Sequence, residues 1–260
     1  MTAVLILLPP SEGKAVPRRG SPLDLSGLSF QGLTPARERV LDALVDLAHR
    51  DDAAAVLGLG GTQSDLVDLD RRLRTAPTAR ADRVYTGVLY DALDLDTLSS
   101  AARRRASARL AVTSSLFGLV RPGDRIPSYR LSGDVSLPGL GPVAGVWRGA
   151  LDDVVRAALG RGLLVDLRSS TYAAFWRPAA DLAPRVATVR VLHEVNGRRQ
   201  VVSHFNKATK GRILRELLEA GANPRTPARL AEALRDLGWT VEVAHGTKRA
   251  VQLDVVVTDL

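Results

Sequence analysis

Short apolar segments recur along this chain, and a group of polar residues follows each of them. Leu110–Ser114 and Leu163–Leu167 are two such segments, and residues 1–8 form a third. Apolar runs of this length between helical patterns are typical of buried strands in an α/β sheet. Loops at the carboxyl ends of such strands present the ligand groups in open α/β folds. The polar residues after these segments are therefore the first candidates for a functional site.

Helical patterns separate the expected strands. The expected helices span residues 34–50, 64–73, 96–107, 145–159, 207–221 and 226–237, with a helical turn at 90–95. Further strands are expected at 83–89, 186–195, 199–205, 239–244 and 250–257, and Asn196-Gly197 is a strong hairpin signal. Strands and helices alternate in the early part of the chain, and hairpins dominate its late part. These patterns predict an α/β fold with a mixed, partly antiparallel sheet and surrounding helices. Nothing divides residues 1–260, so a single domain is expected.

The residue types exclude several kinds of site. The chain has no cysteine, which rules out disulfides and thiolate metal sites and fits a reducing, cytoplasmic compartment. The four histidines lack metal-ligand spacing, and the glycines at 58–61 have no acidic partner at dinucleotide-fold distance. We therefore expect no metal and no cofactor. Residues 1–8 precede Pro9-Pro10 and read as a strand, not a signal peptide, and no segment is long enough for a membrane span.

The charge favours an anionic partner. The chain carries 36 basic and 28 acidic residues, a net charge of +8. Such a balance favours nucleic acid, although 32 of the basic residues are arginines, a bias that a GC-rich genome also produces. The four lysines are Lys14, Lys207, Lys210 and Lys248. Where arginine is the usual cation, a lysine can be retained for a compact ammonium with a tunable pKa.

The loop after the first segment offers three functional groups. Ser11, Glu12 and Lys14 supply a hydroxyl, a carboxylate and an ammonium within four residues. They could bind phosphate or act together as acid and base. The alternative is a solvated turn. The loop lacks the glycine pattern of a nucleotide-binding P-loop.

The segment from Thr113 to Arg130 has the densest polar chemistry. It contains the hydroxyls of Ser114, Ser115 and Tyr129 and the guanidinium groups of Arg121 and Arg130. A long ordered loop inside a compact domain is usually functional, and the arginines could grip phosphate bidentately. The alternative is that Arg121 pairs with Asp124 as a structural clasp.

Three further segments are candidates, each with a structural alternative. Thr86 and Tyr90 flank a strand-to-helix corner, and Ser169 and Tyr172 follow an expected strand where Ser169 could simply cap a helix. Lys207 and Lys210 lie three residues apart near a helix start, where cations oppose the helix dipole unless an anion joins them. The alternative there is a solvated helix start. The turn at 137–142 resembles the hairpin of a helix-hairpin-helix DNA module, but an ordinary Pro-Gly turn is favoured.

The chain resembles the YaaA-type peroxide-stress family. Residues 114–122 read Ser-Ser-Leu-Phe-Gly-Leu-Val-Arg-Pro, and Tyr-Arg-Leu follows at 129–131, similar to that family's central signature. Residues 85–90, Trp147, 166–172 and 205–211 match later or flanking blocks in the same order. Two departures stand out: the opening loop reads Leu-Pro-Pro-Ser-Glu-Gly-Lys where better-known members have Ser-Pro-Ala-Lys, and Arg168 stands where they usually have Ala.

The resemblance implies a single α/β domain of unusual topology with a basic cleft. It also implies binding of duplex or branched DNA, and a role in limiting free iron and oxidative DNA damage under hydrogen peroxide. On this reading Arg121, Arg130, Lys207 and Lys210 line the cleft, and Tyr90, Tyr129 and Tyr172 stack on or orient the substrate. The resemblance implies no catalytic activity.

The rival hypothesis is an enzyme that acts on a small phosphorylated or nucleoside-like substrate. Glu12 with Lys14 would be the acid–base pair, and Ser114, Ser115 and the cations would position this small anionic ligand. A wide groove would favour DNA, and a closed pocket would favour the enzyme. Direct iron storage is least favoured because the chain has no cysteine, paired histidine or Glu-x-x-His motif.

Overall fold

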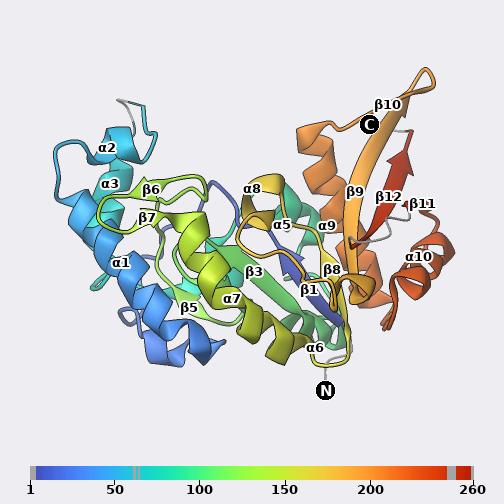
Figure 1. Ribbon diagram of the computed structural model, residues 1–260, viewed down its shortest axis with the longest axis horizontal. Helices are drawn as coiled ribbons and strands as arrows, with labels where there is room; N and C mark the ends of the chain where they lie inside the picture. Colours follow the sequence, from blue (N-terminus) through green and yellow to red (C-terminus); the bar gives the residue numbers. More distant parts are fainter. Residues whose placement is uncertain (1–3, 61–62, 64, 245–249, 259–260) are drawn as a thin grey trace.

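The computed structural model describes residues 4–60, 63, 65–244 and 250–258. Lys248, His245, the residues before Val4, Ser64 and the glycine cluster from residue 61 lie outside the described residues, as does the side chain of His204. Eight strands of the described part form one sheet, in the order β11-β12-β9-β8-β1-β3-β4, with β10 added to β9 (Figure 1). Their bounds are β1 (Val4–Leu8), β3 (Leu110–Ser114), β4 (Gly118–Val120), β8 (Leu163–Asp166), β9 (Val186–Val195), β10 (Arg198–Gln200), β11 (Thr240–Ala244) and β12 (Val251–Val257).

The sheet is mixed, as predicted. β1 is parallel to β3 and β8, and β9 is parallel to β8 and β12. The pairs β3–β4, β9–β10 and β11–β12 are antiparallel. Asn196 and Gly197 both have positive φ at the predicted hairpin, the conformation that a two-residue turn of this type requires.

Helices surround this sheet. They are α1 (Thr34–Ala48), α2 (Ala53–Val56), α3 (Asp65–Arg71), α4 (Ala81–Val84), α5 (Val88–Leu93), α6 (Ser100–Arg109), α7 (Val143–Leu159), α8 (Ser170–Ala173), α9 (Ser203–Glu219) and α10 (Pro227–Asp236). Local signals explain several boundaries: the side chains of Ser99 and Thr226 cap α6 and α10, and prolines stand in the first turns of α1 and α10. None of the described helices has the length and apolar character that crossing a bilayer needs.

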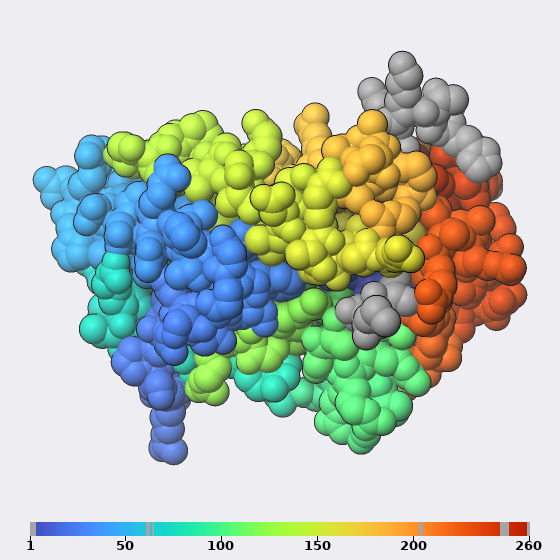
Figure 2. All heavy atoms as spheres, turned by 60° about the horizontal axis from the view of Figure 1, so that its bottom comes forward, coloured from blue at the N-terminus to red at the C-terminus, as the bar shows by residue number. Residues whose placement is uncertain are grey.

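Helices from the first quarter of the chain and elements from its last quarter lie at opposite ends of the molecule (Figure 1). Figure 2 shows the α1 segment in blue toward one end and the C-terminal segment with α10 in orange-red at the opposite end. Strands β1 and β8 lie between them in Figure 1. All five residues of β1 are buried, and both α6 and α7 contact this strand. The core is therefore built around β1.

Two predicted strands are wrong, one wholly and one in part. The strand expected at 199–205 ends with β10 at Gln200, and α9 begins at Ser203. Residues 83–89 do not form a strand, because Arg83 and Val84 end α4 and Val88 begins α5. Between them Tyr85 makes only an isolated bridge to Lys14, and Gly87 turns the chain with φ of +99°. The burial of the Tyr85 ring decides this conformation over the strand propensity of the segment. The segment expected to be a loop at 116–129 contains β4 and the short strand β5 (Arg125–Ile126).

The start of β4 is packed tightly against a buried tryptophan. Gly118 has φ of +71°, and a Cβ there would lie 2.7 Å from two ring atoms of Trp147. The indole is fixed, because Trp147 is fully buried and its Nε1 donates to the Ser115 carbonyl at 2.7 Å. A side chain at this position therefore meets strain in the backbone and a clash in the core.

We predict that Gly118→Ala lowers the free energy of unfolding by about 2–4 kcal/mol. The control is Gly149→Ala, at an exposed position of α7 where a new Cβ meets nothing within 4 Å. This control should raise stability by about 0.5–1 kcal/mol, since alanine is a better helix former. Urea unfolding followed by circular dichroism measures both. Equal stability of the two variants would contradict this account of Gly118.

Candidate functional site

The loops after β1, β3 and β8 meet where these parallel strands have their carboxyl ends. We call this end of the sheet the strand-end edge, and the end where these strands begin the opposite edge. β1 pairs with β3 on one side and with β8 on the other, all in parallel. The chain first passes from β1 to β3 and only later returns to β8, so the loops after β1 and β8 diverge. Such a topological switch point is where open α/β sheets bind ligands. We call the polar groups gathered here the strand-end site.

All four tyrosines of the chain gather at this site. The hydroxyls of Tyr85 and Tyr129 are 3.0 Å apart, and the Tyr129 hydroxyl lies 2.8 Å from Ser114 Oγ. Tyr90 stacks on Tyr85 with ring centroids 5.8 Å apart. Burial raises the pKa of Tyr129 well above its usual range, and the pKa of Tyr172 is raised by burial and by its closeness to Tyr129. These phenols therefore stay protonated.

Lys14 is held against this tyrosine cluster. Its Nζ donates to the Ser11 carbonyl at 2.9 Å and lies 4.4 Å from the centre of the Tyr129 ring. Burial of the ammonium lowers its pKa to about 8, against the opposing effect of Glu12. The loop itself is fixed by Thr86, whose backbone N–H donates to Ser11 Oγ at 3.0 Å. A substantial fraction of Lys14 is thus neutral near pH 8.

Asp70 is a site residue that the sequence reasoning missed. It lies on α3, is fully buried, and its Oδ1 accepts from the Arg130 backbone N–H at 2.8 Å. Its Oδ2 is buried without a partner. Burial raises the pKa of Asp70 to about 8. The available signal was spacing: Asp70 lies three residues from both Val67 and Leu73, so it belongs to the buried face of the helix.

Arg130 and Glu12 form an ion pair at the outer rim. Arg130 Nη1 donates to Glu12 Oε2 at 2.8 Å, and the two side chains are 21% and 59% exposed. The Arg130 Nε is buried without a partner. Both residues also act electrostatically on Lys14. The rim therefore combines one cation and one carboxylate above a buried ammonium and a buried carboxyl.

The β8 side of the edge carries a second buried lysine. Lys210 Nζ donates to the Leu167 carbonyl at 3.1 Å, and burial lowers its pKa to about 8. Lys207, one turn earlier on α9, is exposed. Arg168 forms a buried ion pair with Asp166 at 2.7 Å and also donates to the Trp176 carbonyl. Arg168 thus has a structural role.

Two predicted residues do not join the cluster. Arg121 lies at the opposite edge of the sheet, where its Nη1 donates to the carbonyls of Ala108 and Leu110 and its guanidinium stacks on the Phe30 ring at 4.8 Å. The expected clasp with Asp124 is made by the backbone N–H of Arg121. Ser169 is exposed at the N-cap position of α8, where its side chain makes no cap hydrogen bond. Ser115 donates to the Leu131 carbonyl at 2.5 Å.

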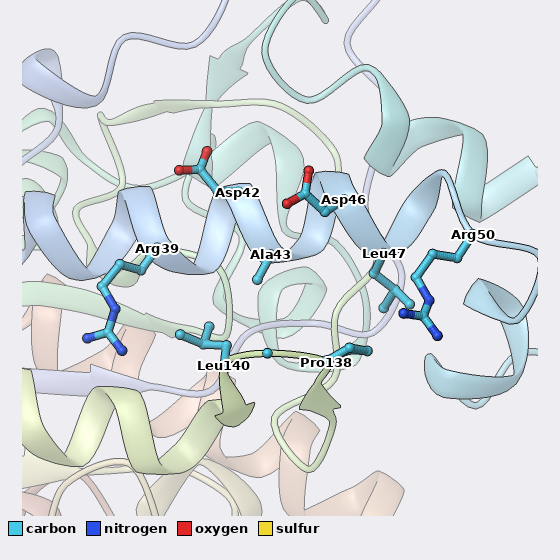
Figure 3. A pocket seen from close by; sticks show the side chains of 9 residues that line it. Arg39, Asp42, Ala43, Asp46, Leu47, Arg50, Pro138 and Leu140 are labelled. Atoms are coloured by element: carbon cyan, nitrogen blue, oxygen red, sulfur yellow. The ribbon is translucent and has the colours of Figure 1, made fainter.

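An open surface groove lies between α1 and the turn at 138–140. Its volume is about 550 Å³. In Figure 3 the side chains of Arg39 and Arg50 point toward the turn, whereas Asp42 and Asp46 point away from it. The turn follows the short strand β6 (Ser136–Leu137), so no helix precedes it directly. The groove therefore presents two guanidinium groups and the backbone of a Pro-Gly turn.

The buried carboxyl of Asp70 makes stability depend on pH. In the folded protein it keeps its proton up to about pH 8, whereas the unfolded chain loses it near pH 4. The folded state binds more protons in this window, so the free energy of unfolding falls as pH rises, by up to about 1.4 kcal/mol for each pH unit. Lys14 affects the pH dependence of stability only above about pH 8, where the folded and unfolded chains begin to differ in the protonation of its amine.

We therefore predict that Asp70→Asn removes this pH dependence. Compared with the unsubstituted protein, the variant gains more stability at pH 8 than at pH 5. Urea unfolding at both pH values measures the difference, and Asp51→Asn at an exposed position is the control with an unchanged pH profile. Parallel pH profiles of Asp70→Asn and the unsubstituted protein would contradict a protonated Asp70.

Known proteins related to this chain match it over nearly its full length. A family model described as peroxide stress protein YaaA matches residues 4–244. A UPF0246 protein of Streptomyces coelicolor is 53% identical over 99% of this chain and 100% of its own length. Another from Corynebacterium efficiens is 42% identical over 97% of this chain and 100% of its own length. These matches confirm the resemblance carried by the 114–131 motif: the chain belongs to the peroxide stress protein YaaA family.

Proposed function

We propose that this protein acts in the response to hydrogen peroxide by binding DNA, duplex or branched, and thereby limits iron-driven damage to it. The observation that carries this proposal is a set of cations with no partner. Among the described residues ten exposed arginines and Lys207 make no ion pair and no side-chain hydrogen bond. The ten are Arg18, Arg19, Arg39, Arg103, Arg104, Arg161, Arg177, Arg198, Arg212 and Arg225.

Exposed cations that have no partner within the protein are available to bind the phosphates of DNA. Each phosphate contact releases a counterion and makes affinity fall with salt. Lys207 lies on the helix whose Lys210 reaches the end of β8, so it belongs to the strand-end side of the sheet. Arg39 beside the turn at 138–140 offers a second phosphate contact. In this proposal the basic cleft runs along the strand-end edge.

The test compares two charge reversals of equal size. Lys207→Glu should weaken binding to a fluorescent DNA duplex about tenfold at 0.1 M salt and lower the slope of log K against log salt by about 1. Arg161→Glu is the control: Arg161 is also unpaired, but it precedes β8 and so lies at the opposite edge of the sheet, outside the proposed cleft. Fluorescence anisotropy across a salt series measures both.

Two results would contradict the proposal. One is the absence of any affinity for duplex or junction DNA at low salt. The other is equal weakening by Lys207→Glu and Arg161→Glu, which would show a nonspecific effect of net charge.

A second candidate function is catalysis or binding of a small anionic or nucleoside-like ligand at the strand-end site. The specific observation that favours it is the desolvated pair of Lys14 and Asp70, beside the hydroxyls of Tyr129 and Ser114. Titratable groups with strongly shifted pKa values at a strand-end edge are typical of ligand-binding and catalytic sites. Binding of DNA phosphates alone does not require buried proton donors and acceptors.

For this candidate we predict a retained small molecule. Native mass spectrometry of gently purified protein should show a ligand mass that disappears on denaturation. Lys14→Ala should lose this ligand, whereas Arg161→Ala should keep it. If the native and denatured masses agree, and a panel of nucleoside monophosphates leaves the Tm unchanged, this second function is excluded.

A further inference from the structure

Lys14 and Asp70 are two desolvated titratable groups held by neighbouring residues: the Lys14 ammonium lies over the Tyr129 ring, and Asp70 accepts from the backbone N–H of Arg130. Among the described residues Lys14 makes no ion pair, because the neighbouring carboxylate of Glu12 pairs with Arg130 instead. Yet Lys14 and Asp70 act on each other electrostatically. Burying two titratable groups without direct pairing costs stability, because each must give up its charge or its hydration. Such an arrangement at a strand-end edge indicates a functional role for these two groups.

The surroundings of Lys14 are those of a nucleophilic amine. Lysines become nucleophiles when they are desolvated or placed next to another cation. Lys14 has both features: its ammonium is held over the Tyr129 ring at 4.4 Å, and Arg130 is a neighbouring positive charge. The residue keeps part of its surface exposed, so a small molecule can reach it. In a chain whose cations are mostly arginine, only lysine can supply this chemistry.

The rim ion pair indicates what else the substrate carries. Arg130 holds the carboxylate of Glu12, whose side chain is 59% exposed and comes from the loop that also carries Lys14. A carboxylate or phosphate of a ligand can take the place of Glu12 on this guanidinium. An anionic group bound there lies beside Lys14.

We propose that Lys14 forms an imine with a small aldehyde or ketone that carries an anionic group, with Arg130 binding the anion and Asp70 transferring the proton. This inference rests on the second proposed function, a small-ligand site at the strand ends. The substrate class is therefore a carbonyl compound with a carboxylate or a phosphate.

The step balances with the groups present. The neutral Lys14 nitrogen attacks the carbonyl carbon, and a proton moves from nitrogen to the former carbonyl oxygen to give a carbinolamine. The protonated carboxyl of Asp70 then donates its proton to that hydroxyl, which leaves as water while the nitrogen lone pair completes the C=N bond. The products are a protonated imine, one water molecule and the Asp70 carboxylate. This carboxylate is then close to the new positive charge.

The experiment traps the imine by reduction. The protein is incubated with glyoxylate at pH 8, treated with sodium borohydride, and mapped by peptide mass spectrometry. We expect the glyoxylate adduct on Lys14 at about ten times or more the level on exposed Lys207 of the same molecule, because a lower pKa leaves more neutral amine. This internal comparison needs no variant. Equal modification of the two lysines overturns the proposal.

Variants test the assigned roles. Asp70→Asn should slow adduct formation at Lys14 about 100-fold, and Arg130→Leu should remove the preference for glyoxylate over uncharged acetaldehyde. Arg229→Leu, which breaks an exposed ion pair with Glu232 on α10, is the control that leaves Lys14 modification unchanged. If Asp70→Asn forms the adduct at the unchanged rate, the proton-transfer role is overturned.

The two proposals for this site can fail separately. A small molecule that is retained only when Lys14 is present, but leaves no adduct after borohydride, keeps the small-ligand function and removes the imine. The absence of both a retained ligand and an adduct removes both proposals.

Discussion

The burial of β1 between two parallel neighbours is the constraint on which the rest of the structure depends. With every residue of β1 covered, its backbone can satisfy its hydrogen bonds only through β3 and β8. The register that follows, with Leu7 opposite both Ala111 and Asp166, brings three loop starts to the same level. The Leu167 N–H extends this pairing by donating to the Leu7 carbonyl at 2.9 Å. The strand-end site is thus a geometric consequence of the core.

The two edges of the sheet use their charged residues differently. At the edge where β3 begins, Arg121 binds the backbone carbonyls of Ala108 and Leu110. This guanidinium group holds the end of β4 against the start of β3. At the strand-end edge Lys14 and Asp70 are desolvated and stay apart, which costs stability. This cost in stability is the reason that our proposals place the binding chemistry at the strand-end edge.

Apolar runs, helix-start residues and turn residues in the sequence predicted those elements whose conformation depends on neighbouring residues in the chain. The apolar runs at 110–114 and 163–167, the Pro-containing start of α1 and the turn at Asn196-Gly197 are all in place. The 83–89 segment failed because tertiary burial of Tyr85 overrides its strand propensity. Asp70 was missed because its role depends on the Arg130 backbone, 60 residues away in sequence. The edge at which Arg121 lies follows from the β3–β4 hairpin, which the sequence did not predict.

The gathering of all four tyrosines has a spectroscopic consequence. In most proteins the phenol absorption and emission bands average over many environments. Here they come from one cluster, in which the Tyr85 and Tyr129 hydroxyls share a hydrogen bond and Lys14 lies over the Tyr129 ring. The phenol part of the ultraviolet difference spectrum, once separated from the bands of the three tryptophans, is therefore a local signal of the strand-end site, available without any attached label.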